Sequence, residues 1–267
     1  MLYHRNVHGA HTASARVGQN PENGASTATE PLNPMRQRLT LLVPALNEEE
    51  AIGGVIRSFP YDALRAMGIE PWVLVVDGHS HDRTREIAER AGAEVTIQPG
   101  RGKGDGIRHG LRHATGDMVL VIDADGTYPP DAIPSIVERL SDGCDVVVGS
   151  RIRGSIEPGA MPRVNYVGNR FLSLLATALY GTTITDVCSG MWGLRTGAIP
   201  RIEIRCDGFD IEPEVIAEAC RLRLRVQEVP IAYSGRKGET KLSNPLRAGV
   251  LDALRLLTVR FRVHRTA

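Results

Sequence analysis

Two aspartates separated by a single residue follow a short apolar run near the middle of the chain. Residues 118–122 are apolar, and Asp123, Ala124 and Asp125 come directly after them. Carboxylate oxygens placed in this way are hard ligands that suit Mg²⁺ or Mn²⁺, and such a cation would bridge them to a diphosphate. Taken alone, the triplet is more often a solvated turn, so its meaning depends on the motifs around it.

A second segment has the composition of a phosphate-binding loop. Residues 100–106 contain four glycines together with Arg101 and Lys103. This composition lets backbone amides and a lysine approach phosphate groups closely. The spacing matches neither the P-loop nor the glycine pattern of dinucleotide-binding folds, so neither of these sites is predicted.

The rest of the sequence predicts the elements that must position these residues. Four short apolar runs have the composition of strands buried on both faces. These runs are residues 39–43, 72–76, 118–122 and 145–149. Residues 52–59 and 133–140 lie between them and have the apolar spacing of helices. The alternation predicts an α/β fold with a doubly wound, mostly parallel sheet flanked by helices.

Ligands of such open sheets bind beyond the carboxyl ends of the strands. The first run is followed by a segment from Pro44 to Glu48, in which Asn47 is a candidate cap for the next helix. The second run is followed by Asp77, in a turn that could place its carboxylate over a bound nucleobase. For Asp82, a few residues later, a plain helix-capping role is equally consistent with the pattern.

Composition limits the class of protein. The chain has 267 residues, of which 42% are hydrophobic, 24% charged and 4% aromatic, as in globular proteins. We find no run of about 18 apolar residues and no secretion signal, and the four cysteines are scattered, so we expect a cytosolic protein. Residues 1–36 lack apolar periodicity and predict a disordered leader. Two further parts are expected, a catalytic domain over 37–244 and a basic amphipathic helix over 245–267.

Charge is unevenly distributed along the chain. From Arg221 to the end there are eleven Lys and Arg against three acids, a local charge of +8, whereas the rest carries −7. A basic segment of this kind indicates an anionic partner such as a phosphate group or a membrane surface. Nucleic acid is disfavoured because exposed aromatic residues are not interleaved with the basic ones.

The motifs together resemble one family. Six short patterns occur in order between residues 39 and 261, with the residue types and spacing of family 2 inverting glycosyltransferases of the GT-A fold. They are Pro44-x-x-Asn47-Glu48, Asp77-Gly78-x-Ser80-x-Asp82, Gly102-Lys103-Gly104, Asp123-x-Asp125, Gly149-Ser150-Arg151 and Asp186-x-x-Ser189-Gly190. Within this family the chain resembles dolichyl-phosphate and polyprenyl-phosphate mannosyl- and glucosyltransferases. One departure is Gly78, where many relatives carry a second aspartate.

The resemblance implies a donor site for a nucleotide sugar of the UDP-glucose or GDP-mannose type. Mg²⁺ or Mn²⁺ would be held by Asp123 and Asp125, with Asp125 as the principal ligand. The implied nucleotide-sugar contacts are Pro44, Asn47, Glu48, Asp77, Lys103, Asp123 and Ala124.

The resemblance also implies an acceptor site for a polyprenyl or dolichyl phosphate. The implied phosphate contacts are Arg151, Arg163, Asn169, Arg236 and Lys241. The residues expected to act in catalysis are Asp125, Arg151, Glu212 and Arg236. Glu212 is expected near the metal or the acceptor rather than as an obligatory base, because a phosphate monoester is already anionic.

Two other functions stay open at this point. A soluble family 2 enzyme acting on a hydroxyl or amine of a small metabolite would need a carboxylate base. A catalytically idle nucleotide-sugar-binding module would not need the intact pair of aspartates or the basic loop from Arg236 to Ser243, which resembles a loop of the lipid-phosphate enzymes.

Two apolar stripes bear on membrane contact. One spans residues 167–179, and the other spans residues 246–261 with arginines on its polar side. Such a basic amphipathic helix can lie in an anionic membrane interface or can pack on the catalytic domain. The first alternative predicts a peripheral enzyme at the cytoplasmic membrane face.

Overall fold

The computed structural model of the protein describes residues 37–238 and 244–262. The predicted leader over residues 1–36, and Lys241 among the predicted acceptor contacts, lie outside the described residues. The strands are β1 (Gln37–Ala45), β2 (Ile69–Asp77), β3 (Glu94–Ile97), β4 (Met118–Ile122), β5 (Val146–Ile156), β6 (Met191–Arg195) and β7 (Val226–Tyr233). The α-helices are α1 (Ile52–Arg57), α2 (Tyr61–Ala66), α3 (Thr84–Arg90), α4 (Lys103–His113), α5 (Ile133–Ser141), α6 (Arg163–Tyr180), α7 (Ile211–Arg221) and α8 (Pro245–Arg260). Two short 3₁₀ helices cover Pro130–Ala132 and Thr196–Arg201.

The strands form one mixed sheet with the order β3-β2-β1-β4-β6-β5-β7. All neighbouring pairs are parallel except the two that involve β6, which runs antiparallel to both β4 and β5. The predicted α/β fold with a doubly wound, mostly parallel sheet is confirmed. The apolar runs did not identify β3, β7 or β6, the last a five-residue strand with a central glycine, Gly193.

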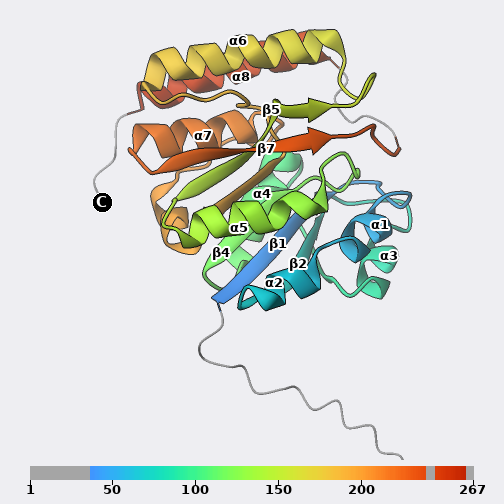
Figure 1. The fold of residues 1–267 in the computed structure, drawn as a ribbon. Coiled ribbons are helices and arrows are strands. Elements are labelled where there is room, and N and C mark those ends of the chain that lie inside the picture. The colour runs from blue at the N-terminus through green and yellow to red at the C-terminus, as the bar shows by residue number, and fades with distance from the viewer. Residues whose placement is uncertain (1–36, 239–243, 263–267) are drawn as a thin grey trace, which may run out of the picture. The chain divides into compact units, whose positions relative to one another are not determined.

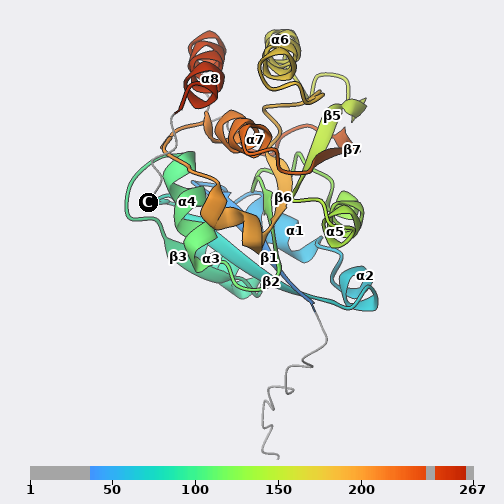
Figure 2. The same cartoon turned by 90° about the vertical axis from the view of Figure 1, so that its left-hand side faces the viewer.

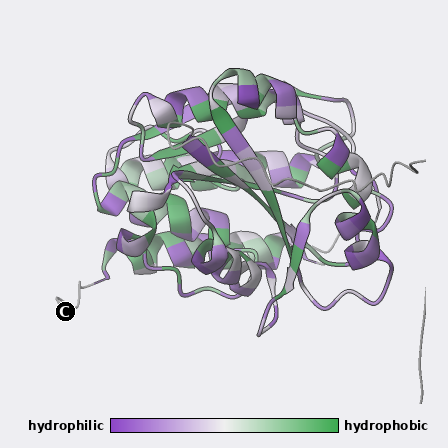
Figure 3. Ribbon diagram, turned by 90° about the horizontal axis from the view of Figure 1, so that it is seen from below, coloured by the Kyte–Doolittle hydropathy of each residue, from purple (hydrophilic) through white to green (hydrophobic). Residues whose placement is uncertain are grey.

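Helices cover both faces of this sheet, as the alternation of buried side chains in the strands requires (Figure 1). On β1, Leu39, Leu41 and Val43 face one apolar cluster that includes residues of α1 and α5, whereas Leu42 faces a second cluster with residues of α4, α6, α7 and α8. Hydrophobic residues are accordingly concentrated along the central strands (Figure 3). Burial on both faces explains why the strands read as continuous apolar runs.

Helices α6 and α8 lie side by side and pack on α7, on the β5 and β7 side of the molecule (Figures 1 and 2). Helix α8 presents Asp252, Leu256 and Val259 inward, where all three are buried. Its predicted apolar stripe faces the other way, with Leu246 73% and Phe261 76% exposed. In the described residues, no helix is long and apolar enough to cross a membrane.

Arginines near the end of the described chain fix α8 on α7. Arg255 pairs with Asp210 at 2.6 Å, and Arg262 pairs with Glu214 and Glu218 at 2.7 Å each. Glu214 and Glu218 have fully buried side chains. Part of the basic charge predicted to meet an external anion is therefore neutralised by acids of the same chain.

Candidate functional site

Asp77 closes strand β2 and lies fully buried at the carboxyl edge of the sheet. Its Oδ2 atom accepts hydrogen bonds from the backbone amides of His79 and Ser80, each at 3.0 Å. Its Oδ1 atom is buried and has no hydrogen-bond partner among the residues that the structure describes. A buried acceptor without a donor costs free energy unless a ligand supplies the donor. This oxygen therefore has an unmet capacity to accept a hydrogen bond.

Gly78 stands where the resemblance leads us to expect a second aspartate. A Cβ atom added here would lie 3.3 Å from the carbonyl oxygen of Ala45 and 3.4 Å from Cβ of Leu46. The amide of Gly78 donates to the same carbonyl oxygen at 2.8 Å. The turn after β2 thus lies close against the end of β1, and a side chain would crowd it.

The segments after β1 and β2 are joined by hydrogen bonds between side chains and backbone. The Asn47 amide donates to Oγ of Ser80 at 2.9 Å, and its side-chain Oδ1 accepts from the amide of His81 at 2.9 Å. The Glu48 amide donates to Oγ1 of Thr84 at 2.8 Å. No side chain caps α1, so the cap predicted for Asn47 is replaced by this link, with Asn47 itself at a left-handed φ of 49°.

Asp82 has both a local and a longer-range role. Its Oδ1 accepts from the amide of Thr84 at 3.0 Å, at the start of α3. Its Oδ2 accepts from the amide of Glu49 at 3.1 Å, in the segment after β1. Pro44 lies in β1 opposite Val76 of β2, so the predicted donor residues of both strands share one corner of the sheet.

Lys103 joins the two halves of the candidate site. At the start of α4, its Nζ atom lies 2.6 Å from Oδ1 of Asp123 and 2.5 Å from Oε1 of Glu212, at the start of α7. Burial disfavours the charge of this lysine, but the two carboxylates outweigh burial and raise its pKa. Burial raises the pKa of both Asp123 and Glu212, and Lys103 opposes that effect.

The glycines around Lys103 serve packing rather than an open phosphate loop. The Gly104 amide donates to the carbonyl oxygen of Asp207 at 2.9 Å, and a Cβ atom at Gly104 would lie 2.5 Å from the carbonyl oxygen of Cys206. At Gly102, with φ 93°, a Cβ atom would overlap the carbonyl oxygen of Asp207. The side chain of Lys103 therefore faces the candidate site, as the predicted phosphate loop requires. The amide of Gly104 already donates to Asp207 and does not point to a phosphate.

Asp125 is a buried carboxylate with four hydrogen bonds. Its Oδ1 accepts from the amide and hydroxyl of Thr127, at 3.0 and 2.7 Å. Its Oδ2 accepts from Nε and Nη2 of Arg236, at 2.9 and 2.7 Å. Gly126 adopts a φ of 76°, which permits the tight turn. Ala124, between the two aspartates, is buried, with 3% of its surface exposed.

The donor set of this turn suits a magnesium-like ion that a substrate completes. Within the described ranges, no group of three or more His, Cys, Asp or Glu side chains is placed to hold a metal ion. Mg²⁺ is commonly bound by one or two carboxylates together with substrate phosphates and water. Asp123 and Asp125, on one turn at the end of β4, provide that number of carboxylates.

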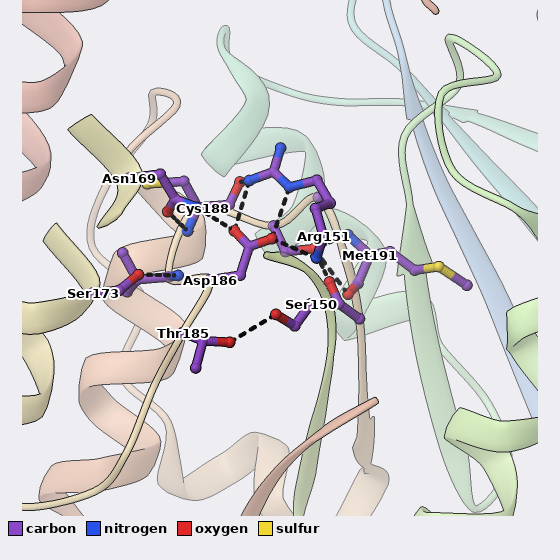
Figure 4. Close-up of polar contacts among 12 residues, drawn as sticks. Ser150, Arg151, Asn169, Ser173, Thr185, Asp186, Cys188 and Met191 are labelled. Carbon is purple, nitrogen blue, oxygen red and sulfur yellow. Dashed lines mark hydrogen bonds and ion pairs between the residues drawn. The ribbon is translucent and has the colours of Figure 1, made fainter. Parts of the chain in front are cut away.

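Arg151, predicted to contact the acceptor phosphate, lies in a buried network after the inner part of β5 (Figure 4). Its Nε and Nη2 atoms donate to the two carboxylate oxygens of Asp186, at 2.8 and 2.7 Å. Nη2 also donates to the carbonyl oxygen of Cys188 at 2.8 Å. The guanidinium lies against Tyr233 and Tyr128, with its central carbon 5.2 and 5.9 Å from the ring centres. Within the described chain, only Nη1 of this group makes no hydrogen bond.

The other predicted acceptor contacts are placed differently. Asn169, on the inner face of α6, donates to Oδ1 of Asp186 at 2.7 Å and accepts from the amide of Cys188 at 3.1 Å. Arg163 is exposed at the first turn of α6. Arg236 pairs with Asp125, one of the residues predicted to hold the metal ion. The predicted phosphate contacts thus form no single cluster in the described part of the chain.

The three acids between Phe209 and Val215 are Asp210, Glu212 and Glu214, and they have different partners. Asp210 and Glu214 hold arginines of the α8 region, whereas Glu212 faces Lys103 and Asp123. Gly190 lies against the carboxylate of Asp123, because a Cβ atom added at Gly190 would overlap that carboxylate. Glu212 is therefore the acid of this segment that lies in the candidate site.

Asp252 is a site residue that sequence analysis did not identify. It lies on the inner face of α8, is 8% exposed, and accepts from the thiol of Cys188 at 3.8 Å. Burial, with the neighbouring carboxylates of Glu212 and Asp210, raises its pKa to about 7. The available signal was a single acid in a helix made mostly of apolar and basic residues.

Comparisons with known proteins assign the chain to a family. The profile of Glycosyl transferase family 2 matches residues 40–202. The Haloferax volcanii protein named Glycosyltransferase AglJ is 34% identical over 225 residues, which cover 84% of this chain and 72% of that protein. The Dolichyl-phosphate hexose transferase of the same organism is 35% identical, with 79% of this chain and 89% of that protein covered.

A solved structure is similar as well. Glucosyl-3-phosphoglycerate synthase from Mycobacterium tuberculosis has a TM-score of 0.67 at 23% identity, covering 86% of this chain and 82% of that one. At this identity the likeness concerns the fold. The chain belongs to glycosyl transferase family 2, has the GT-A fold, and is a glycosyltransferase.

Proposed function

We propose that the protein transfers a hexose from a nucleotide sugar to a polyprenyl or dolichyl phosphate, with inversion and with Mg²⁺ or Mn²⁺, at the cytoplasmic face of a membrane. The relative named Dolichyl-phosphate hexose transferase supports the acceptor class. The observation that carries the proposal is an exposed apolar surface on α6 and α8, next to the Arg151 network.

The donor half is proposed to hold the nucleoside diphosphate. The structurally similar synthase was crystallised with Mn²⁺, UDP-glucose and phosphoglyceric acid. In this chain Asp77 would accept from the base, and Asp123 and Asp125 would ligate the cation. Such an ion neutralises the charge that develops on the departing diphosphate. Lys103 pairs with both Asp123 and Glu212, and it keeps these two carboxylates close together at the end of β4.

The outer faces of α6 and α8 form the proposed membrane-facing surface. Its large apolar residues are Val164, Tyr166, Val167, Phe171, Leu174, Leu246, Val250, Leu251, Leu254, Leu257 and Phe261, all more than one third exposed. Exposed arginines accompany them at Arg163, Arg170, Arg247 and Arg260. Apolar residues with flanking cations match the acyl boundary and anionic headgroups of a bilayer. A patch of this extent is unusual on a monomeric soluble protein.

The inner faces of these two helices contact the site. Asn169 of α6 bonds to Asp186, and Asp252 of α8 bonds to Cys188. In this proposal, α6 and α8 separate the membrane surface from the Arg151 network, and the lipid phosphate would reach Nη1 of Arg151 beside these helices. Because the phosphate is already a nucleophile, the proposal needs no carboxylate base.

A transfer assay tests this function. Purified protein with Mn²⁺ and radiolabelled UDP-glucose or GDP-mannose is offered a polyprenyl phosphate in vesicles, and label is measured in the organic phase. We expect label to enter the lipid with one donor and to be lost in EDTA. Asp125→Asn should reduce turnover by about 10²-fold or more, whereas the exposed Asp131→Asn should not. Lipid that stays unlabelled with every donor would refute the acceptor class.

One observation favours a second candidate, a transferase acting on a hydroxyl group of a small metabolite. Asp252, with a pKa of about 7 and near Glu212, has the properties of a general base. The similar synthase was crystallised with phosphoglyceric acid, a small molecule, together with UDP-glucose. Transfer to 3-phosphoglycerate that is abolished by Asp252→Asn would favour this candidate over the lipid phosphate.

A further inference from the structure

Arg236 occupies the oxygen of Asp125 that a metal ion would need. We propose that Arg236 is a built-in counter-ion for this carboxylate, which a divalent cation must displace. We further propose that the displaced guanidinium then binds a substrate phosphate. This inference rests on the proposed metal site, and it adds a switch that couples metal binding to phosphate binding.

The contacts of Asp125 leave no unoccupied oxygen in the described structure. Thr127 holds Oδ1 from the backbone and the hydroxyl, so this oxygen is fixed by its own turn. Arg236 holds Oδ2 with two of its nitrogens. An ion at Oδ2 would therefore meet a positive charge within 3 Å of the oxygen, and the two cations exclude each other.

The backbone around Arg236 is anchored independently of its side chain. The amide of Ser234 donates to the carbonyl oxygen of Thr127 at 3.0 Å, and the amide of Lys237 donates to the carbonyl oxygen of Asp125 at 3.1 Å. The amide of Gly235 donates to Glu157 at 3.1 Å. The guanidinium can thus leave Asp125 by side-chain rotation while residues 234–237 stay in place.

The environment of Arg236 suits a residue that moves. Its side chain is 28% exposed, whereas the Asp125 side chain is 6% exposed. A second carboxylate, Glu48, lies 3.9 Å from its Nη2 atom. Arg236 is therefore held by two carboxylates at a partly exposed position. A phosphate could accept the same pair of guanidinium hydrogen bonds that Asp125 now accepts. Lys103 differs, because it is buried between two carboxylates and joins α4 to α7.

Metal binding without substrate measures the counter-ion directly. Mn²⁺ is titrated into the full-length protein and followed by electron paramagnetic resonance or calorimetry. We expect Arg236→Gln to bind Mn²⁺ about tenfold more tightly than wild type, because the competing cation is gone. Lys237→Gln is the matched control, since it removes the same charge from the next residue, whose side chain is exposed. It should change the affinity less than about twofold.

Repeating the titration with phosphate ligands tests the second half of the proposal. UDP or GDP is added in one arm, and a short-chain prenyl phosphate in another. By linkage, a phosphate that takes up Arg236 must tighten Mn²⁺ binding in wild type more than in Arg236→Gln. The arm in which this difference occurs identifies the phosphate that Arg236 binds. Equal tightening in both proteins, in both arms, would overturn the transfer of the arginine.

The remaining outcomes separate the switch from the metal site. Equal Mn²⁺ affinity in wild type and Arg236→Gln would overturn the counter-ion role and leave the metal site in place. An equal gain in Lys237→Gln would do the same, because any nearby positive charge would then suffice. Absence of Mn²⁺ binding in every protein, even with UDP or GDP, would overturn the metal site itself. Adding Asp125→Asn to either protein should abolish binding.

Discussion

A single buried acid on α8 makes folding sensitive to pH. In the folded protein the pKa of Asp252 is raised to about 7 from an ordinary value of 3.8. Between these values the unfolded chain releases this proton and the folded chain keeps it, so stability falls as pH rises toward 7.

Asp252→Asn should remove this dependence. The melting temperature of the variant should rise relative to wild type between pH 5 and pH 8, with the free-energy gap widening by at most about 3 kcal/mol. Thermal melts across that range measure it. The exposed Asp131→Asn serves as the control, and a constant offset between Asp252→Asn and wild type at all pH values would show that Asp252 ionises normally.

Arg151 has a structural role in addition to its proposed role in acceptor binding. Its side chain is 9% exposed and its partner Asp186 is fully buried, so Arg151→Ala leaves a buried carboxylate without its main partner. We expect the free energy of unfolding to fall by about 3–5 kcal/mol. Urea denaturation checks this, with the exposed Arg153→Ala expected within about 0.5 kcal/mol of wild type. A normal unfolding midpoint for Arg151→Ala would mean that the network contributes little to the fold.

Acceptor kinetics of Arg151 variants therefore have to be measured on folded protein. Arg236→Ala should raise the acceptor KM with a smaller loss of stability, because this side chain is partly exposed and Asp125 keeps its two hydrogen bonds from Thr127. The sequence predicted the same acceptor-binding role for both arginines. Their removal is expected to affect the free energy of unfolding to different extents.

At the scale of elements, α6 and α8 each have a buried inner face and an outer face with exposed apolar residues. Changing Phe171, Leu174 and Leu254 together to serine should weaken binding to anionic vesicles at least about fivefold, because apolar area is lost from the outer surface. Vesicle sedimentation measures this, and the melting temperature should stay the same. Met67→Ser removes an apolar residue that is 41% exposed on another side and is the control. Unchanged sedimentation together with loss of a dimer in gel filtration would assign the surface to a second copy of the chain.

Elements defined by local pattern could be predicted, and those defined by distant contacts could not. The run 118–122 coincides with β4, and the helical spacing at 133–140 falls within α5. Strand β6 has only five residues, and nothing in its own composition specifies antiparallel pairing with β4 and β5.

The same limit applies within the candidate site. Residues at strand ends, such as Asp77 and Asp125, followed from the position of the preceding apolar runs. The pairing of Arg236 with Asp125 spans 111 residues, and the contact of Asp252 with Cys188 spans 64. The sequence placed Arg236 on a loop and Asp252 on a helix, but it carried no information on which carboxylate or thiol each would meet.

At the scale of the whole molecule, the sequence predicts that the first 36 residues are dispensable. They contain none of the motifs of the site and too few apolar residues to support a core. Deleting them should leave turnover unchanged and shift the melting temperature by less than about 2 °C. A fall of many degrees would show that the segment contributes to the folded protein.

The position of β6 has a consequence for synthesis of the chain. Strand β4 is complete at residue 122, yet its partner on one side does not begin until Met191, and β7 follows only at Val226. During elongation the first four strands therefore emerge with an apolar edge on β4 that has no neighbour for about 70 residues of translation. All five residues of β4 are buried in the finished sheet. A ribosome that stalls before residue 191 would release a fragment with this edge open to other chains, and we expect such a fragment to aggregate.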